Sequence, residues 1–171
     1  STGCGIGLSM IEQQPERIST LSLISPWTHA DNHLTKMQNL RVAAAKALSP
    51  SDYFRYNISL LYSPNYRKQH INGFEKMEVD AKEIKVDHKF IYDGLKPILE
   101  FDGRDIITTV RCPTLVAHSA DDQLMPPWFG LSIVERIPKS DYLQFQSGGH
   151  MLIETRTNEL ASKITNLIQN K

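Results

Sequence analysis

The stretch RCPTLVAHSADDQLMP, residues 111–126, combines a short apolar run with a polar loop that ends at a proline. Residues 113–118 within it are expected to form a strand. Further along the chain we expect a helix at 127–137, a strand at 142–146 and an amphipathic helix at 155–168. Strands and helices that alternate in this way predict an α/β fold, with a parallel sheet covered by helices on both faces.

The beginning of the chain follows the same alternation. Residues 2–14 are expected to form a helix that starts among small residues and ends near Pro15. Residues 18–24 (ISTLSLI) are apolar and rich in β-branched side chains, and this run is short enough for a buried strand. The two ends of the chain, residues 1–27 and 101–171, are therefore expected to form one α/β core.

The middle of the chain, residues 28–100, has a different character. It is mostly helical by pattern, and we interpret it as a helical cap inserted into the core. Asp31 is a candidate N-cap for a first helix, and Ser51 or Asp52 for a second. Two Gly-containing pairs are expected to interrupt the helices that follow, namely Asn72-Gly73 and Asp93-Gly94.

The composition of the chain limits the classes of partner that we expect. The 171 residues include 40% hydrophobic and 22% charged side chains, with 19 basic and 19 acidic groups that cancel to a net charge of zero. We see no Lys/Arg cluster that would follow a phosphate backbone, and no apolar run near the roughly 18 residues that span a bilayer. We therefore expect neither nucleic acid nor membrane as a partner. Two cysteines, Cys4 and Cys112, make no disulfide framework, so a cytoplasmic location is expected.

Three short segments contain residues suited to catalysis. The chain begins Ser1-Thr-Gly and leads directly into the first expected helix, which matches the second half of a G-x-S-x-G nucleophile elbow. Asp121 and Asp122 follow the strand at 113–118. The third segment, Ser-Gly-Gly-His150, follows the strand at 142–146, and its two glycines allow a sharp turn before the histidine.

Taken together, these segments resemble the α/β-hydrolase superfamily, in which serine, acid and histidine occur in this order. The resemblance rests on R-C-P-T-L-V before the acid, G-G-H before the last helix, and P-E-R-I after the first helix, and it covers residues 1–27 and 105–171. Within the superfamily, the chain looks closest to the 3-oxoadipate enol-lactonase and aminoacrylate hydrolase group. It would represent the C-terminal part of the fold, starting at the nucleophile.

The resemblance implies a serine hydrolase that uses no cofactor and no metal. Ser1 would be the nucleophile, His150 the general base, and Asp122 the acid that orients His150, because a proline stands four residues after it. The N–H of Thr2 would contribute to the oxyanion hole. The substrate would be a small ester, lactone, amide or similar carbonyl compound, hydrolysed through an acyl-enzyme.

One departure from the family pattern bears on partners. The family has several strands before the nucleophile, and one loop among them supplies the second oxyanion donor. This sequence starts at Ser1, so we expect a companion segment or chain that supplies those strands.

Several alternatives remain open. An N-terminal-nucleophile hydrolase would use Ser1 with its own α-amino group as base, and a non-catalytic binding protein could share the scaffold. Ser9 is a rival serine within the first helix.

Other side chains have both a functional and a structural interpretation. His29 and His33 have the spacing of a helical metal pair but lack an evident third ligand, and His118 is expected to be packed or exposed. Aromatic residues are candidates for a substrate pocket, with the core as the alternative: Trp27, Tyr53 and Phe54.

Overall fold

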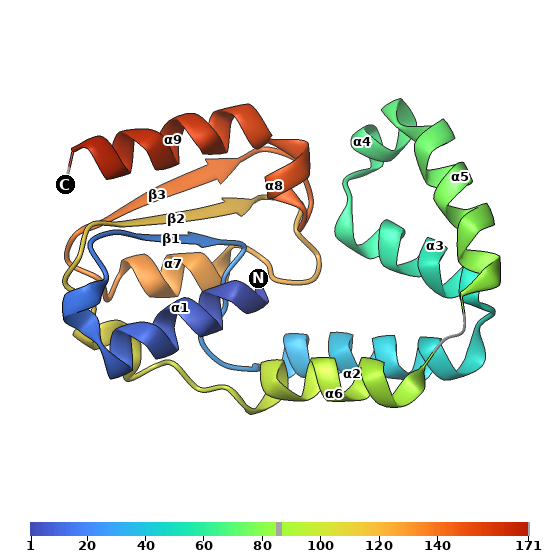
Figure 1. Cartoon of the computed structure of the whole chain (residues 1–171), viewed down its shortest axis with the longest axis horizontal. Coiled ribbons are helices and arrows are strands. Elements are labelled where there is room, and N and C mark those ends of the chain that lie inside the picture. Colours follow the sequence, from blue (N-terminus) through green and yellow to red (C-terminus); the bar gives the residue numbers. More distant parts are fainter. Residues whose placement is uncertain (85–86, 171) are drawn as a thin grey trace.

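A short parallel sheet forms the centre of the α/β part of the molecule (Figure 1). The structure is a computed structural model, and it describes residues 1–84 and 87–170. The strand order is β1 (Leu21–Ile24), β2 (Thr114–Ser119), β3 (Ser140–Phe145), and both pairings are parallel. The sequence predicted a strand at 113–118, and every residue of β2 is buried, as suits a strand with a neighbour on each side.

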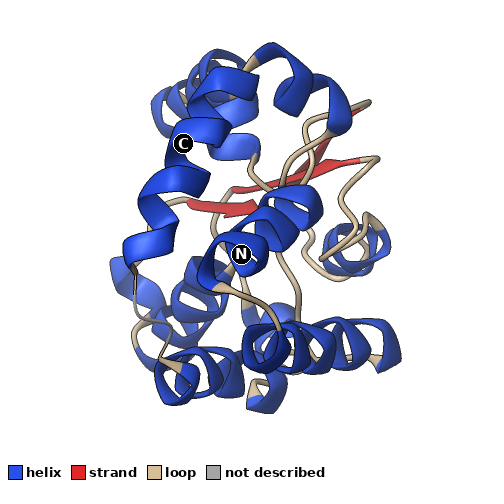
Figure 2. Cartoon of the chain, turned by 90° about the vertical axis from the view of Figure 1, so that its right-hand side faces the viewer, coloured by secondary structure: helices blue, strands red, loops and turns tan. Residues whose placement is uncertain are grey.

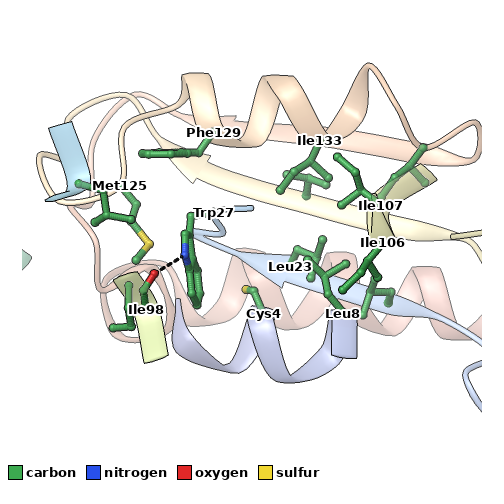
Figure 3. Close-up of a cluster of buried hydrophobic side chains, with 14 of the residues drawn as sticks. Cys4, Leu8, Leu23, Trp27, Ile98, Ile106, Ile107, Met125, Phe129 and Ile133 are labelled. Carbon is green, nitrogen blue, oxygen red and sulfur yellow. Dashed lines mark hydrogen bonds between the residues drawn. The ribbon is translucent and has the colours of Figure 1, made fainter. Parts of the chain in front are cut away.

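Helices cover both faces of this sheet. On one face, α1 (Thr2–Gln13) and α7 (Trp128–Val134) enclose the main hydrophobic core, which Figure 3 shows between the two helices and the strands. On the other face, α8 (Leu152–Thr155) and α9 (Thr157–Gln169) pack over a smaller apolar cluster. Neighbouring residues of β2 therefore face different layers, Val116 toward the main core and Ala117 toward the smaller cluster.

The segment between β1 and β2 is helical. In Figure 1, α2 and α6 run side by side below the sheet, and α3 packs against α5 at one end of the molecule. Figure 2 shows the molecule from a second direction, with helices on several sides of the strands. The helices of this segment are α2 (Asn32–Ala47), α3 (Pro50–Leu61), α4 (Pro64–Gln69), α5 (Ile71–Asp80) and α6 (His88–Glu100). Short 3-10 turns complete the fold: η1 (Pro15–Arg17), η2 (Ala81–Glu83) and η3 (Ile106–Thr109).

The helix caps agree with the sequence at one position and differ at another. Asp31 caps α2 as expected, since its Oδ1 accepts a hydrogen bond from the N–H of Leu34 at 2.8 Å. The prediction of Ser51 or Asp52 for α3 is wrong, because Ser49 caps that helix and accepts from the N–H of Asp52 at 3.1 Å. The physical reason is Pro50, whose fixed φ and missing N–H suit the first helical position.

Two expected interruptions are also wrong. Asn72-Gly73 lies inside α5, and Asp93-Gly94 lies inside α6. A glycine inside a helix costs about 1 kcal/mol relative to alanine. In α6 the apolar side chains of Ile91, Leu95 and Ile98 pack on the main core, and this burial offsets the cost of Gly94.

Across residues 1–84 and 87–170, no helix has the length and apolar character needed to cross a membrane. Cys4 and Cys112 are both free thiols.

Candidate active site

The candidate residues converge because parallel strands end at the same edge of the sheet. The loop after β2 carries Asp122, and the loop after β3 carries His150. Ser1 lies beside the end of β1, where its backbone nitrogen donates to the carbonyl oxygen of Ile24 and approaches the sulfur of Cys4 at 3.4 Å.

Asp122 and His150 form a buried hydrogen-bonded pair. His150 Nδ1 lies 2.9 Å from Asp122 Oδ2, and both side chains are almost fully buried. The other oxygen of the carboxylate, Oδ1, accepts from the N–H groups of Leu124 and Met125 at 3.0 and 2.9 Å. These donors hold the carboxylate in one orientation. An ionised Asp122 would keep the proton of a neutral His150 on Nδ1 and leave the lone pair of Nε2 available.

Asp121, the neighbouring acid, has a different set of partners. Its Oδ1 accepts hydrogen bonds from the backbone N–H groups of Gly148 and Gly149 at 3.0 and 2.8 Å, and from the hydroxyl of Ser119. Gly148 has φ +151° and Gly149 has φ +67°, a region of backbone conformation that favours glycine. Asp121 therefore stabilises the turn that precedes His150. It forms no hydrogen bond with the imidazole of His150.

The backbone of His150 is anchored on two further sides. Its N–H donates to Leu61 O at 2.8 Å, at the end of α3, and its carbonyl accepts from Ser25 Oγ at 3.0 Å, just after β1. A Cβ on Gly149 would lie 2.6 Å from the same Leu61 oxygen, so this contact also requires glycine. The histidine loop is thus held between the helical segment and the sheet.

A cavity of about 440 Å³ opens beside these residues. Ser1, Thr2 and His150 line it, together with side chains from α2, α3 and α6. Among the hydrogen bonds of residues 1–84 and 87–170, none joins Ser1 Oγ to His150, although both residues face this cavity. Thr2 is the first residue of α1, where a backbone N–H has no partner within the helix.

His118 lies near the end of β2, close enough to Asp122 and His150 to feel their charges. It is fully buried, and neither ring nitrogen has a hydrogen-bond partner within the described part of the chain. Burial lowers the pKa of His118 to about 4; the nearby Asp122 opposes this shift, and His150 adds to it. The ring fits only because residue 130 is glycine, since a Cβ there would lie 2.2 Å from His118 Nδ1. Of the two expectations for this residue, packing in the core is the one observed.

The aromatic candidates for a substrate pocket separate. Tyr53 lines the cavity with Ser1 and His150. Trp27 does not, which corrects that expectation: its side chain is 2% exposed, and Nε1 donates to Ile98 O at 3.1 Å in the main core (Figure 3). Phe54 lines an adjoining cavity of about 400 Å³ instead.

Other sequence candidates lie elsewhere. His33 Nε2 contacts Gln123 O at 2.9 Å, and His29 Nδ1 contacts Thr28 Oγ1 at 3.2 Å. No group of three or more metal-ligating side chains occurs among the residues that the structure describes. Ser9 lies within α1 and lines a separate cavity beside Trp27.

Sequence reasoning missed two polar residues of the cavity wall. Gln38 and Arg41 lie on α2 and line the cavity with Ser1 and His150. Their spacing of three residues places them on one face of a helix, but that pattern alone does not indicate which face meets a cavity.

No protein-family model matches the chain. Curated proteins do. A protein named as a carbamate hydrolase, RutD, from Azorhizobium caulinodans is 28% identical over 85% of this chain and 55% of its own length. A RutD from a Caulobacter species is 27% identical over 98% of this chain and 63% of its own length. The chain thus spans little more than half the length of these relatives.

Two solved structures have a fold similar to that of this chain. An α/β-hydrolase from a deep-sea metagenome library, MGS-M2, superposes with a TM-score of 0.90 at 18% identity over 99% of this chain and 62% of its own. The enol-lactonase of Burkholderia xenovorans superposes with a TM-score of 0.83 at 15% identity, over 99% of this chain and 63% of its own.

Proposed function

We propose that this chain, which belongs to the α/β-hydrolase superfamily and has the C-terminal part of its fold, carries the catalytic residues of a serine hydrolase. The observation that supports the proposal most strongly is the buried pair of Asp122 and His150, joined at 2.9 Å beside a cavity that Ser1 also lines. A buried carboxylate–imidazole pair at the carboxyl end of a parallel sheet is suited to general base catalysis.

In this mechanism His150 Nε2 takes the proton of Ser1 as the serine oxygen attacks a carbonyl carbon. Asp122 fixes the tautomer of His150 and stabilises the imidazolium that forms. The imidazolium then protonates the leaving group, and water releases the acyl group from Ser1 by the same base catalysis. The proton transfer requires Ser1 Oγ to come within hydrogen-bond reach of His150 when substrate is bound. Catalytic hydrogen bonds are often longer in an apo structure than in the reacting complex.

The oxyanion would form near the start of α1. We assign the N–H of Thr2 as one donor, because this residue lines the cavity and its N–H has no partner within the helix. The helix N-terminus adds a favourable partial positive charge at that position.

An N-terminal-nucleophile mechanism has less support. It requires the nitrogen of Ser1 to accept a proton as the base. In the structure this nitrogen donates to Ile24 O, an oxygen of β1, and no described group orients it as a base toward Ser1 Oγ. The pair of Asp122 and His150 would also have no role in that mechanism.

The domain organisation and the free edge of the sheet extend the proposal. Residues 28–100 would act as a cap over the core of residues 1–27 and 101–171, since both contribute to the cavity wall. Within the described residues β1 pairs with β2 alone, and a further strand along its other edge would complete the sheet of the active form. Two free thiols are consistent with a cytoplasmic protein.

The substrate would be a small ester, lactone, amide or carbamate, which a cavity of about 440 Å³ can hold. Carbamate is included because it appears in the names of the curated relatives.

To test the proposal, p-nitrophenyl acetate turnover is measured with the intact protein and its Ser1→Ala and His150→Ala variants. We expect turnover in the wild type and a loss of several orders of magnitude in both variants. Turnover that survives in Ser1→Ala would refute the assignment of the nucleophile. The rival serine provides a control, because Ser9→Ala should keep wild-type turnover.

A further inference from the structure

Ser25 has an unusual backbone conformation. It directly follows β1, and within the described part of the chain it is the only residue other than glycine with a positive φ, at +47°. Positive φ is uncommon for residues that have a side chain, and glycine, asparagine and aspartate adopt it most readily. Pro26 follows, and a residue before proline normally has an extended backbone. Two local preferences therefore oppose the conformation of Ser25.

Tertiary contacts hold Ser25 in this conformation. The residue is only 1% exposed, and its backbone N–H donates to the carbonyl oxygen of Ala117 on β2 at 2.8 Å. Two residues later, the side chain of Trp27 is packed in the main core, which fixes the chain on the other side. Strained backbone of this kind persists only where the surrounding structure determines it, and it occurs often at functional sites.

The hydroxyl of Ser25 binds the main chain of the histidine that acts as base in the proposed function. Ser25 Oγ donates to the carbonyl oxygen of His150 at 3.0 Å, and this bond is buried. Within residues 1–84 and 87–170, no other group donates to that oxygen. The N–H of His150 is held separately, by Leu61 O at 2.8 Å. Ser25 therefore fixes one of the two peptide groups that flank the Cα of His150.

Glycine at position 25 would relieve the strain but could not form this bond. It adopts positive φ about as readily as negative φ, so it would fit the backbone at this position. It has no side chain, however, and the carbonyl of His150 would lose its donor. The backbone conformation and the hydrogen bond thus favour different residues, and the sequence has the residue that keeps the hydrogen bond.

We infer that Ser25 is a positioning residue, which holds the main chain of His150 so that the imidazole stays in contact with Asp122. Nδ1 of this ring lies 2.9 Å from Asp122 Oδ2, and a shift of the main chain would lengthen that hydrogen bond. A misplacement of about 1 Å at a reacting group can lower a rate by about 10²-fold. The effect on turnover rests on the proposed function, whereas the effect on the bond between Asp122 and His150 does not.

Two variants of Ser25 separate positioning from stability. Ser25→Ala removes the hydroxyl and keeps the strain, whereas Ser25→Gly removes the hydroxyl and relieves the strain. In the intact protein we expect Ser25→Gly to unfold at a higher urea concentration than Ser25→Ala. Both should nevertheless lose about 10–100-fold in kcat for p-nitrophenyl acetate, with little change in KM, because Ser25 does not line the cavity. If Ser25 only stabilised the fold, Ser25→Gly would turn over like the wild type.

Ser140→Ala is the matched control. The hydroxyl of Ser140 also donates to a backbone carbonyl, that of Ile137 at 2.8 Å, but Ser140 lies at the first residue of β3, at the opposite end of the sheet from His150. Loss of this hydroxyl should lower stability and leave kcat at the wild-type value.

A second readout does not depend on turnover. The ¹⁵N NMR shifts of the His150 ring, assigned by comparison with His150→Ala and followed to high pH so that the ring is neutral, report which nitrogen carries the proton. We expect the proton on Nδ1 in the wild type and in Ser140→Ala, and a mixture of both tautomers in Ser25→Ala and Ser25→Gly, because the bond to Asp122 is weakened.

The two readouts distinguish failure of this inference from failure of the proposed function. If the tautomer changes in both Ser25 variants but the wild type hydrolyses no ester, the hydrolase proposal fails and the positioning role stands. If the tautomer is the same in the wild type and both Ser25 variants, the positioning role is refuted, and ester turnover by the wild type leaves the hydrolase proposal standing.

Discussion

The carboxylate of Asp121 accepts a hydrogen bond from the backbone N–H of Gly149 at 2.8 Å. Because the same oxygen also binds Gly148 N–H and the Ser119 hydroxyl, this residue acts on the loop backbone and not on the imidazole. Asp121→Ala should therefore lower stability by about 1–3 kcal/mol through the loss of these bonds. Urea unfolding of the intact protein measures this change. Asp121→Asn, which keeps an acceptor oxygen, should be close to wild type.

Substitution of Asp122 should lower turnover and leave the fold intact, whereas substitution of Asp121 should lower stability. Asp122→Asn keeps the shape of the side chain but favours the wrong tautomer of His150, and we expect turnover to fall by about 10⁴-fold with the fold retained. Ester turnover and circular dichroism on the same preparation check both parts. If Asp121→Asn causes the large loss and Asp122→Asn does not, the assignment of the acid is off by one residue.

The burial of His118 predicts a pH dependence of stability. Its pKa falls from 6.5 to about 4 on folding, so the unfolded chain takes up a proton at a higher pH than the folded protein. Stability is therefore complete above about pH 6.5 and declines as the pH falls toward 4, by about 2 kcal/mol at about pH 5.

The His118→Leu variant isolates this effect. Urea unfolding at about pH 7 and pH 5 should show that the variant loses about 2 kcal/mol less than the wild type over this interval. The histidines that do not interact with His118 are common to both proteins and cancel in the comparison; His150, which lowers the pKa of His118, is the exception. Equal losses in the two proteins would mean that His118 is not the buried neutral group described.

Gly94 lies inside α6 and also forms part of the cavity wall. A Cβ at this position meets no atom within 4 Å, and the residue lines the cavity with Ser1. Gly94→Ala should therefore stabilise α6 by about 0.5–1 kcal/mol, because alanine has the higher helix propensity. Thermal unfolding of the two proteins tests this, with Gly73→Ala in α5 as a control outside the cavity. A destabilised Gly94→Ala would show that the space is already filled.

Much of the fold could be predicted because local signals agreed with tertiary packing. The run at 113–118 has Leu, Val and Ala at its centre, and β2 is buried at every position. Asp31 caps α2 through its own side chain, which is a local interaction. The glycines of α5 and α6 gave the opposite result, because helix packing outweighs a local preference that amounts to about 1 kcal/mol.

The residues of the site were also only partly predictable from the sequence. The sequence singled out Asp122 and His150 by short motifs, and the structure brings them to 2.9 Å. It gave no sign of Gln38 and Arg41, because their place in the cavity depends on how α2 lies against α6 and α3. It also placed Trp27 at the substrate, whereas the indole packs in the core with its N–H on a carbonyl of α6.

The most direct test of the central claim is to locate a covalent adduct. The intact protein is treated with a fluorophosphonate, which reacts with an activated serine, and the modified residue is identified by peptide mass spectrometry. We predict a single adduct on Ser1 that disappears in His150→Ala, because the histidine is needed to activate the hydroxyl. An adduct on another serine, or labelling of Ser1 that persists without His150, would contradict the account.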